Sequence, residues 1–305
     1  MNKIDVSKDR HLYIGASDIP AICGLSSYAT PYEVYLEKTG ELEKEKNINM
    51  EVGKRLEPVI RQLYLDTLED KESNTPNQNL TDGWLFNDYE VTHKDYSFLK
   101  AHLDGYHEPT RTVLEIKTTG VNFLEIPIPY LLQVAFQCLL SDASEAHIAI
   151  LKGTSFMVSK YERNQNLEKI VLDKALEFWG RVQERNPPPC RGEEDIKMRN
   201  EKIIKSISGE PLIAKGFTLE KINKFKEIKE EYDIIKKKYE SAKVDLINDI
   251  HTHELIIDEN GDALATYKYN KSREMIDKDK LKKEYPDIYE RVRKQCSPAR
   301  PLLIK

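Results

Sequence analysis

The sequence predicts an α/β domain with a central mixed sheet and flanking helices, followed by a C-terminal extension. In the first 189 residues, segments with helical spacing of apolar residues precede strand-like segments, and another helix separates the last two strands. A triple proline at 187–189 follows the last helix of this part and cannot continue it, because proline lacks the backbone N–H that a helix needs. We therefore expect a core at residues 1–189 and an extension at 190–305.

Apolar spacing places the elements of the core. Steps of three and four between apolar residues predict helices, whereas alternating runs rich in β-branched and aromatic residues predict strands. A polar, turn-rich stretch at 70–83 predicts a loop. The helices are expected at residues 31–38, 50–68, 130–140 and 167–185, and the strands at 84–92, 98–106, 113–118 and 146–151.

The extension is expected to contain a long helix, a β-hairpin and a basic tail. Thr218 is a candidate N-cap for a helix at 219–246, whose apolar residues recur in steps of three and four. Such a stripe is typical of a long packed or coiled-coil-like helix. Two short strands within 254–269 are joined through an Asn-Gly pair at 260–261, which tolerates the backbone angles of a tight hairpin turn.

The charge distribution leaves a nucleic-acid partner open. The net charge of −5 alone argues against such a partner, but residues 265–305 hold 12 Lys and Arg against 6 Asp and Glu. No apolar run approaches the roughly 20 residues that cross a bilayer, and the N-terminal segment lacks the apolar stretch of a secretory signal. We therefore expect a cytoplasmic protein without a membrane partner. The four scattered cysteines argue against a zinc knuckle and a disulfide framework.

Two acidic residues and a lysine form the candidate catalytic motif. Glu115 and Lys117 are alternate residues of a predicted strand, so their side chains share one face while Ile116 points into the core. Asp104 is separated from Glu115 by ten residues and can meet it from the preceding strand. Two carboxylates and the backbone carbonyl of Ile116 supply the oxygen ligands that Mg²⁺ prefers. Lys117 would orient or help activate the attacking water.

The acid-x-Lys pattern is weak by itself, because a chain rich in Lys and Glu produces it by chance. It recurs at 195–197 and 227–229, but only Glu115 and Lys117 lie in an apolar strand with an acidic partner one hairpin upstream. An ordinary ion-pair ladder on the sheet surface is the alternative interpretation.

Two predicted helices add polar side chains. Glu57 lies near the apolar side of the helix at 50–68, and a buried carboxylate needs a partner or a metal. Gln133 and Gln137 are four residues apart and share one face of the helix at 130–140. For the two glutamines, the alternative is a pair of core-edge amides bonded to backbone.

The order of these residues resembles the phage lambda-exonuclease type of viral recombinase, a family of PD-(D/E)xK nucleases often called YqaJ-like. The resemblance covers about residues 10–185. It implies a restriction-endonuclease-like core, two bound Mg²⁺ ions that Mn²⁺ could replace, and digestion of one strand of duplex DNA from its 5′ end. The residues that carry it are the Gly-Ala-Ser-Asp-Ile-Pro run at 15–20, the Gly-Lys-Arg-Leu-Glu run at 53–57, Asp104, Glu115, Lys117 and Gln133.

The resemblance also implies roles for single residues. Asp104 and Glu115 resemble the metal ligands, and Lys117 resembles the water-orienting lysine. Glu57 resembles a supporting acid that reaches the metals indirectly, and Gln133 resembles a polar positioning residue of the catalytic site.

Arg10 and Ser17 resemble the pair that binds a terminal 5′ phosphate. Without the resemblance, Ser17 is a candidate helix N-cap. Leu103 departs from the family pattern, because it stands where the class is expected to have proline. His102 stands where a small phosphate-contacting residue can sit, and the alternatives for it are a DNA contact or a packed, hydrogen-bonded histidine. The basic tail has two interpretations, a DNA contact or a solvated surface. They apply to residues that include Lys268, Lys271 and Arg273.

The sequence thus predicts a Mg²⁺-dependent 5′-to-3′ double-stranded DNA exonuclease of phage or prophage recombination, which produces single-stranded overhangs for annealing. The expected partners are duplex DNA ends and a single-strand annealing protein in the bacterial host cytoplasm. A homo-oligomer is a further expectation, because relatives form trimeric rings, and the extension could supply subunit, DNA or partner contacts. An endonuclease of the same class and a catalytically silent DNA-binding recombination module are the alternatives.

Overall fold

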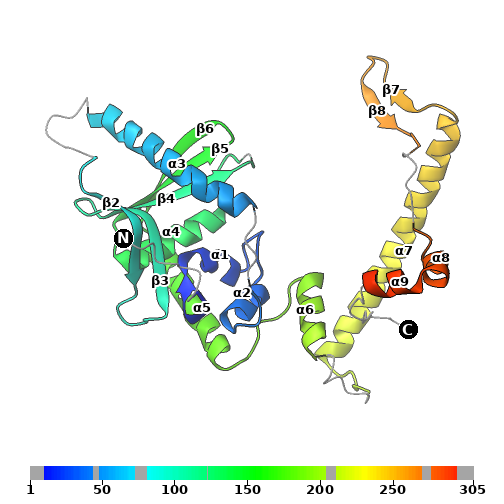
Figure 1. Cartoon of the computed structure of the whole chain (residues 1–305), viewed down its shortest axis with the longest axis horizontal. Helices are drawn as coiled ribbons and strands as arrows, with labels where there is room; N and C mark the ends of the chain where they lie inside the picture. The colour runs from blue at the N-terminus through cyan, green and yellow to red at the C-terminus, as the bar shows by residue number, and fades with distance from the viewer. Residues whose placement is uncertain are drawn as a thin grey trace. The chain divides into compact units, whose positions relative to one another are not determined.

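The computed structural model describes residues 10–43, 48–72, 81–121, 123–203, 211–269 and 276–293. The chain divides into two compact units, Met1–Arg199 and Asn200–Lys305, each of which is described by itself (Figure 1). Most of the loop expected at 70–83 lies outside the described residues. Within the described part of the chain, no helix has the length and apolar character needed to span a membrane.

The first unit is built on a mixed sheet, whose described strands follow the order β1-β3-β4-β5-β6, with β2 also paired to β3. Parallel pairing joins β1 to β3 and β4 to β5, whereas the other pairs are antiparallel. The predicted central mixed sheet is therefore confirmed. The strands are β1 (Ile14–Gly15), β2 (Trp84–Thr92), β3 (Leu99–His107), β4 (Thr112–Thr119), β5 (Glu145–Lys152) and β6 (Ser155–Glu162).

Helices flank this sheet, namely η1 (Arg10–Leu12), η2 (Ala16–Asp18), α1 (Ile19–Ile22), α2 (Pro31–Lys38), α3 (Ile48–Glu72), α4 (Ile128–Ser141), α5 (Gln165–Gln183) and α6 (Glu193–Ile203). Side chains alternate along a strand, so the neighbours Val113 and Leu114 enter different apolar clusters. Val113 belongs to the larger cluster, which includes Phe136 of α4 and Phe178 of α5. Leu114 packs in a second cluster with Tyr64 of α3. The sheet is thus buried on both faces.

The helices and strands expected in the core are present, with ends within a few residues of the prediction. Two strands were not predicted. β1 has only two residues, which is too short for any alternation to be recognised. β6 lies at the end of the strand order, and most of its side chains are exposed, so its sequence lacks a continuous apolar face.

The first unit extends beyond the boundary expected at residue 189. Asp195, on α6, is buried, and its carboxylate accepts hydrogen bonds from Thr30 Oγ1 at 2.7 Å and from the Arg191 backbone N–H at 2.8 Å. The Arg191 guanidinium donates to the Gly24 carbonyl oxygen at 3.0 Å. The prolines follow the end of α5 as expected. Residues 190–199 nevertheless belong to the first unit, and the contacts of Asp195 and Arg191 attach them to the core.

The second unit contains the expected long helix and hairpin. Its elements are α7 (Phe217–Ile250), β7 (Leu255–Ile257), β8 (Ala263–Thr266), α8 (Lys278–Glu284) and α9 (Pro286–Val292). The N-cap of α7 is Gly216 rather than the predicted Thr218. In the hairpin turn, Gly261 has a φ of 89°, and the Asp258 carboxylate accepts the backbone N–H groups of Asn260 and Asp262.

The apolar stripe of α7 is exposed. Tyr232, Ile235 and Tyr239 are each about 60% exposed, with values of 59%, 64% and 66%. The described residues therefore do not provide the packing expected for this stripe, and the coiled-coil interpretation stays a prediction.

Candidate active site

Asp104 lies where two strands of the sheet separate. The register of β3 and β4 pairs Gly105 with Leu114 and goes no further toward Asp104. Beyond this point, the Asp104 carboxylate takes the place of a strand partner, because its Oδ2 accepts the backbone N–H of Ile116 at 2.7 Å. This hydrogen bond fixes one carboxylate beside the strand that carries Glu115 and Lys117.

Glu115 is the centre of the site. Its side chain is only 4% exposed, and Lys117 Nζ lies 2.6 Å from its Oε1. Gln133 Nε2 donates to the same oxygen at 2.7 Å, and Gln137 Nε2 donates to Oε2 at 2.6 Å. Lys117 Nζ also donates to Gln133 Oε1 at 2.8 Å. The structure thus brings together the predicted residues Glu115, Lys117 and Gln133, and Asp104 joins them through the Ile116 backbone.

The two helical amides reach Glu115 because they lie one turn apart on α4. Gln137 is fully buried, and no described group bonds its Oε1. The two glutamines are therefore not core-edge amides bonded to backbone; they bind the carboxylate of Glu115. Sequence reasoning placed Gln137 on the right helical face but gave it no role, although the spacing of four residues was the available signal.

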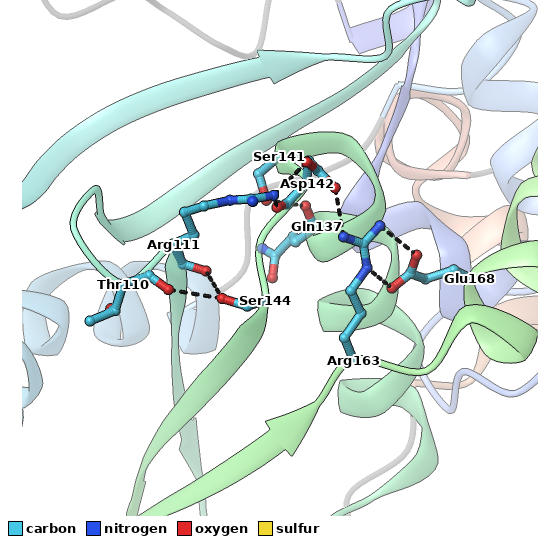
Figure 2. A network of polar contacts seen from close by, with 8 residues as sticks. All are labelled: Thr110, Arg111, Gln137, Ser141, Asp142, Ser144, Arg163 and Glu168. Carbon is cyan, nitrogen blue, oxygen red and sulfur yellow. Dashed lines mark hydrogen bonds and ion pairs between the residues drawn. The ribbon is translucent and has the colours of Figure 1, made fainter.

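A polar network fixes the far end of α4 (Figure 2). Asp142, in a left-handed conformation with a φ of 50°, ends the helix and bonds the guanidinium groups of Arg111 and Arg163. Arg163 also bonds both carboxylate oxygens of buried Glu168, at 2.9 and 3.1 Å. The helix that presents the two glutamines is therefore tied to the turn before β4 and to the start of α5.

The charges of the site influence one another. Burial, and then the charge of Glu115, raise the pKa of Asp104 well above its ordinary value, against the opposing Ile116 N–H and Lys117 ammonium. Burial lowers the pKa of Lys117, but the Glu115 and Asp104 carboxylates outweigh burial, so this pKa is raised. Two carboxylates therefore share a buried site with one adjacent ammonium.

This set of groups fits a divalent cation. Asp104 and Glu115 are close enough for their repulsion to raise the pKa of Asp104, and a cation between their oxygens would relieve that repulsion. Among the described residues, no three His, Cys, Asp or Glu side chains form a group that could hold a metal. The protein would thus supply two carboxylates, and backbone carbonyl, water or phosphate oxygens would complete the coordination.

Glu57 stands at the margin of this site. Its side chain is 35% exposed, and its Oε1 accepts a hydrogen bond from Arg61 Nη2 at 3.1 Å. Its charge is the smallest of the named contributions that raise the pKa of Asp104. The structure therefore places Glu57 within electrostatic range of Asp104 without joining it to a metal-chelating group.

Arg10 and Ser17, the predicted 5′-phosphate pair, lie together. Arg10 Nη2 donates to Ser17 Oγ at 2.7 Å and to Asp18 Oδ1 at 3.0 Å. Asp18 is buried, and its Oδ2 accepts from buried Lys38 Nζ at 2.6 Å. Burial raises the pKa of Asp18, but Lys38 and Arg10 outweigh burial and lower it. Sequence reasoning missed Lys38, because nothing in the motif marks a lysine that α2 carries to this point.

Ser17 does not act as a helix N-cap in this structure. The residue that precedes α1 is Asp18, and the one that precedes η2 is Gly15. The Ser17 side chain is exposed and accepts the hydrogen bond from Arg10.

The remaining candidates are dispersed. His102 is on β3, two residues before Asp104, with its Nε2 3.4 Å from Tyr13 Oη and 3.4 Å from Glu90 Oε2. Lys268 is exposed in the second unit. Lys271 and Arg273 lie outside the described residues.

Comparison with known proteins identifies relatives. Residues 7–144 match the model of the YqaJ-like viral recombinase domain, a range that contains every candidate site residue of the core. The uncharacterized protein YqaJ of Bacillus subtilis (strain 168) is 27% identical over 306 residues, which cover 94% of this chain and 89% of that protein.

Solved structures that are similar to this chain include two exonucleases. The alkaline exonuclease LHK-Exo from Laribacter hongkongensis is 15% identical, with a TM-score of 0.46 over 65% of this chain and 97% of that one. A phage related exonuclease from Haemophilus somnus 129PT is 14% identical, with a TM-score of 0.41 over 65% of this chain and 97% of that one.

Proposed function

We propose that the chain, whose residues 7–144 match the model of the YqaJ-like viral recombinase domain, is a Mg²⁺-dependent DNA exonuclease. It degrades the 5′-ended strand of duplex DNA and leaves single-stranded overhangs for recombination. The observation that carries this proposal is the meeting of Asp104, Glu115 and Lys117 where β3 and β4 separate. An ion-pair ladder on an exposed sheet surface does not account for a glutamate that is 4% exposed and bound by two helical amides.

Asp104, Glu115 and the backbone carbonyl of Ile116 would hold Mg²⁺, with Glu57 acting indirectly. Two bound ions, replaceable by Mn²⁺, would supply charge stabilisation at the scissile phosphate. The chain's own contribution is rigidity. Gln133 and Gln137 hold the two oxygens of Glu115, and the Ile116 N–H holds Asp104, so neither carboxylate is free to rotate.

Lys117 positions the attacking water in this proposal. An ammonium group has three N–H donors, and the contacts with Glu115 and Gln133 use two of them. The third can donate to a water or to a phosphate oxygen. Lys117 would thus align the nucleophile with the phosphorus atom, which lowers the entropic cost of the attack.

Arg10 and Ser17 would bind the terminal 5′ phosphate and so give the enzyme its direction. A guanidinium fork and a hydroxyl are suited to phosphate oxygens, and the 2.7 Å hydrogen bond between them keeps the two groups together. The partners in this proposal are duplex DNA ends and a single-strand annealing protein, in the bacterial host cytoplasm. We also propose that the chain forms a homo-oligomer, because a closed ring around DNA would confer processivity.

One set of substrates tests the function. The purified protein is incubated with linear duplexes that carry 5′-phosphate or 5′-hydroxyl ends and with relaxed closed circles, in Mg²⁺ and in EDTA. We expect Mg²⁺-dependent degradation that is fastest on the 5′-phosphate ends and absent on circles. Rapid cutting of circles would indicate an endonuclease of the same class. Binding without cleavage in Mg²⁺ or Mn²⁺ would indicate a catalytically silent DNA-binding module.

A further inference from the structure

A row of polar side chains leads along β3 to Asp104. Lys100, His102 and Asp104 are alternate residues, and they are partly exposed while the residues between them are buried. The row begins beside β1, where Gly15 pairs with Lys100 in register. β1 follows η1, which contains Arg10, and precedes η2, which contains Ser17. The row therefore connects the neighbourhood of the proposed 5′-phosphate pair with the proposed metal ligands.

Glu90 binds the first two members of the row. It lies opposite His102 in the antiparallel register of β2 and β3. Glu90 Oε1 is 2.8 Å from Lys100 Nζ, and Glu90 Oε2 is 3.4 Å from His102 Nε2. One carboxylate thus contacts both side chains, each through a different oxygen. Two oxygens of a phosphate group could make the same two contacts.

Tyr13, which directly precedes β1, contacts the same two side chains. Lys100 Nζ lies over the Tyr13 ring at 5.6 Å from its centroid, and Tyr13 Oη is 3.4 Å from His102 Nε2. Tyr13 is buried, so its ring provides a rigid floor for the Lys100 ammonium. The position of Lys100 is therefore defined by more than its ion pair with Glu90.

We propose that Lys100 and His102 form a subsite for a backbone phosphate of the DNA strand that enters toward Asp104, and that Glu90 is the internal counter-ion of this subsite. The proposal rests on the nuclease function above and adds a substrate contact to it. When a phosphate binds, Glu90 swings away from Lys100. The Glu90 carboxylate is 39% exposed, and a solvent-exposed ion pair contributes little stability, so the exchange meets little resistance.

The chain contains a matched control for this arrangement. Glu145 on β5 binds His147 Nε2 at 3.2 Å and Lys160 Nζ at 2.5 Å, so it also bridges a histidine and a lysine. Glu145 pairs with Thr112 at the start of β4, away from the point where Asp104 and Glu115 meet. Substitutions there change the same charges without touching the proposed row.

Equilibrium binding to a 5′-phosphorylated duplex, measured in EDTA over a range of KCl concentrations, tests the subsite. Lys100→Met should weaken binding about fivefold to tenfold and reduce the slope of log K against log salt by about 0.9, the loss of one phosphate contact. Glu90→Gln should strengthen binding about threefold, because the competing carboxylate is removed. Lys160→Met and Glu145→Gln should stay within about twofold of the wild type, and thermal unfolding checks that all four variants are folded.

A double variant makes the test specific. If Glu90 acts by occupying Lys100, Glu90→Gln should lose most of its effect in the Lys100→Met background, since coupled residues are non-additive. Equal affinities and salt slopes for folded Lys100→Met and Lys160→Met would overturn the subsite, as would equal effects of Glu90→Gln and Glu145→Gln. These results would leave the nuclease proposal standing if the wild type still cleaves DNA. A wild type that neither binds nor cleaves duplex DNA would overturn both.

Discussion

At the scale of single residues, three charged side chains carry the proposed chemistry. Asp104→Ala, Glu115→Ala and Lys117→Ala should each lower the rate of Mg²⁺-dependent cleavage by about 10²-fold or more, because each removes a metal ligand or the water-positioning ammonium. The measurement is the initial rate on a linear duplex. Glu227→Ala is the matched control, since Glu227 belongs to a second acid-x-Lys sequence on α7 and pairs only with exposed Lys224 among its described contacts. Full activity in folded Asp104→Ala or Glu115→Ala would refute the site.

Arg10 is expected to determine the end preference. Arg10→Ala should reduce the preference for 5′-phosphate over 5′-hydroxyl ends, because the guanidinium that bonds Ser17 is removed while Asp104 and Glu115 remain. The ratio of the two initial rates is the measurement. Arg10→Lys keeps the charge but loses the planar fork and should give an intermediate ratio. An unchanged ratio in Arg10→Ala would remove the terminal phosphate from this site.

Asp18 and Lys38 form a buried pair with a defined pH dependence. The pKa of Asp18 is lowered on folding, so its contribution to stability is complete above its unfolded pKa of about 4 and is lost as the pH falls through the lower folded value. Asp18→Asn should reduce the free energy of unfolding at pH 7 by about 3 to 5 kcal/mol, because Lys38 is left buried without its counter-ion. Denaturant unfolding of both proteins should show this difference shrinking below about pH 4. A difference in the free energy of unfolding that is constant with pH would contradict the lowered pKa of Asp18 in the folded protein.

At the scale of elements, α4 depends on the network at its end (Figure 2). Arg163→Met should reduce the free energy of unfolding by about 3 kcal/mol, because it leaves the carboxylate of Glu168 buried without its bidentate partner. Asp142→Asn should cost less than about 1 kcal/mol, because the Asp142 side chain is 73% exposed. Denaturant unfolding of the two variants compares them directly. Equal costs would mean that the buried pair with Glu168 is not the main anchor.

At the scale of the whole molecule, the end of the first unit can be located by truncation. A chain that ends at Arg199 should unfold cooperatively, because both apolar clusters lie wholly within it. A chain that ends at Pro189 should be less stable by about 1 to 3 kcal/mol, since it loses the Asp195 bonds to Thr30 and the Arg191 bond to Gly24. Denaturant unfolding compares the two. Equal stability would place the boundary at the prolines.

Local physics made much of this protein predictable from its sequence. Apolar spacing reports which side of a helix or strand is buried, and so the core helices α2, α3, α4 and α5, four of the strands, the long helix and the hairpin were predicted. Strand alternation placed Glu115 and Lys117 on the same face of a strand. Helical spacing placed Gln133 and Gln137 on the same face of a helix. The order of these residues also predicted the resemblance to YqaJ-like viral recombinases, whose family model matches residues 7–144. Such features depend on neighbours within a few positions, which a sequence displays directly.

Contacts between distant segments were decided only by the tertiary structure. The Asp104 carboxylate accepts the Ile116 N–H because β3 and β4 separate beyond the Gly105–Leu114 pair, and no periodicity marks that point. Lys38 reaches Asp18, and Asp195 reaches Thr30 across 165 positions, because packing of the helices brings them together. Periodicity reports which face of an element is buried, but the partner of a buried charge is chosen by the arrangement of elements in space. The sequence therefore determined the elements and the candidate residues, whereas the packing decided which of those charges meet.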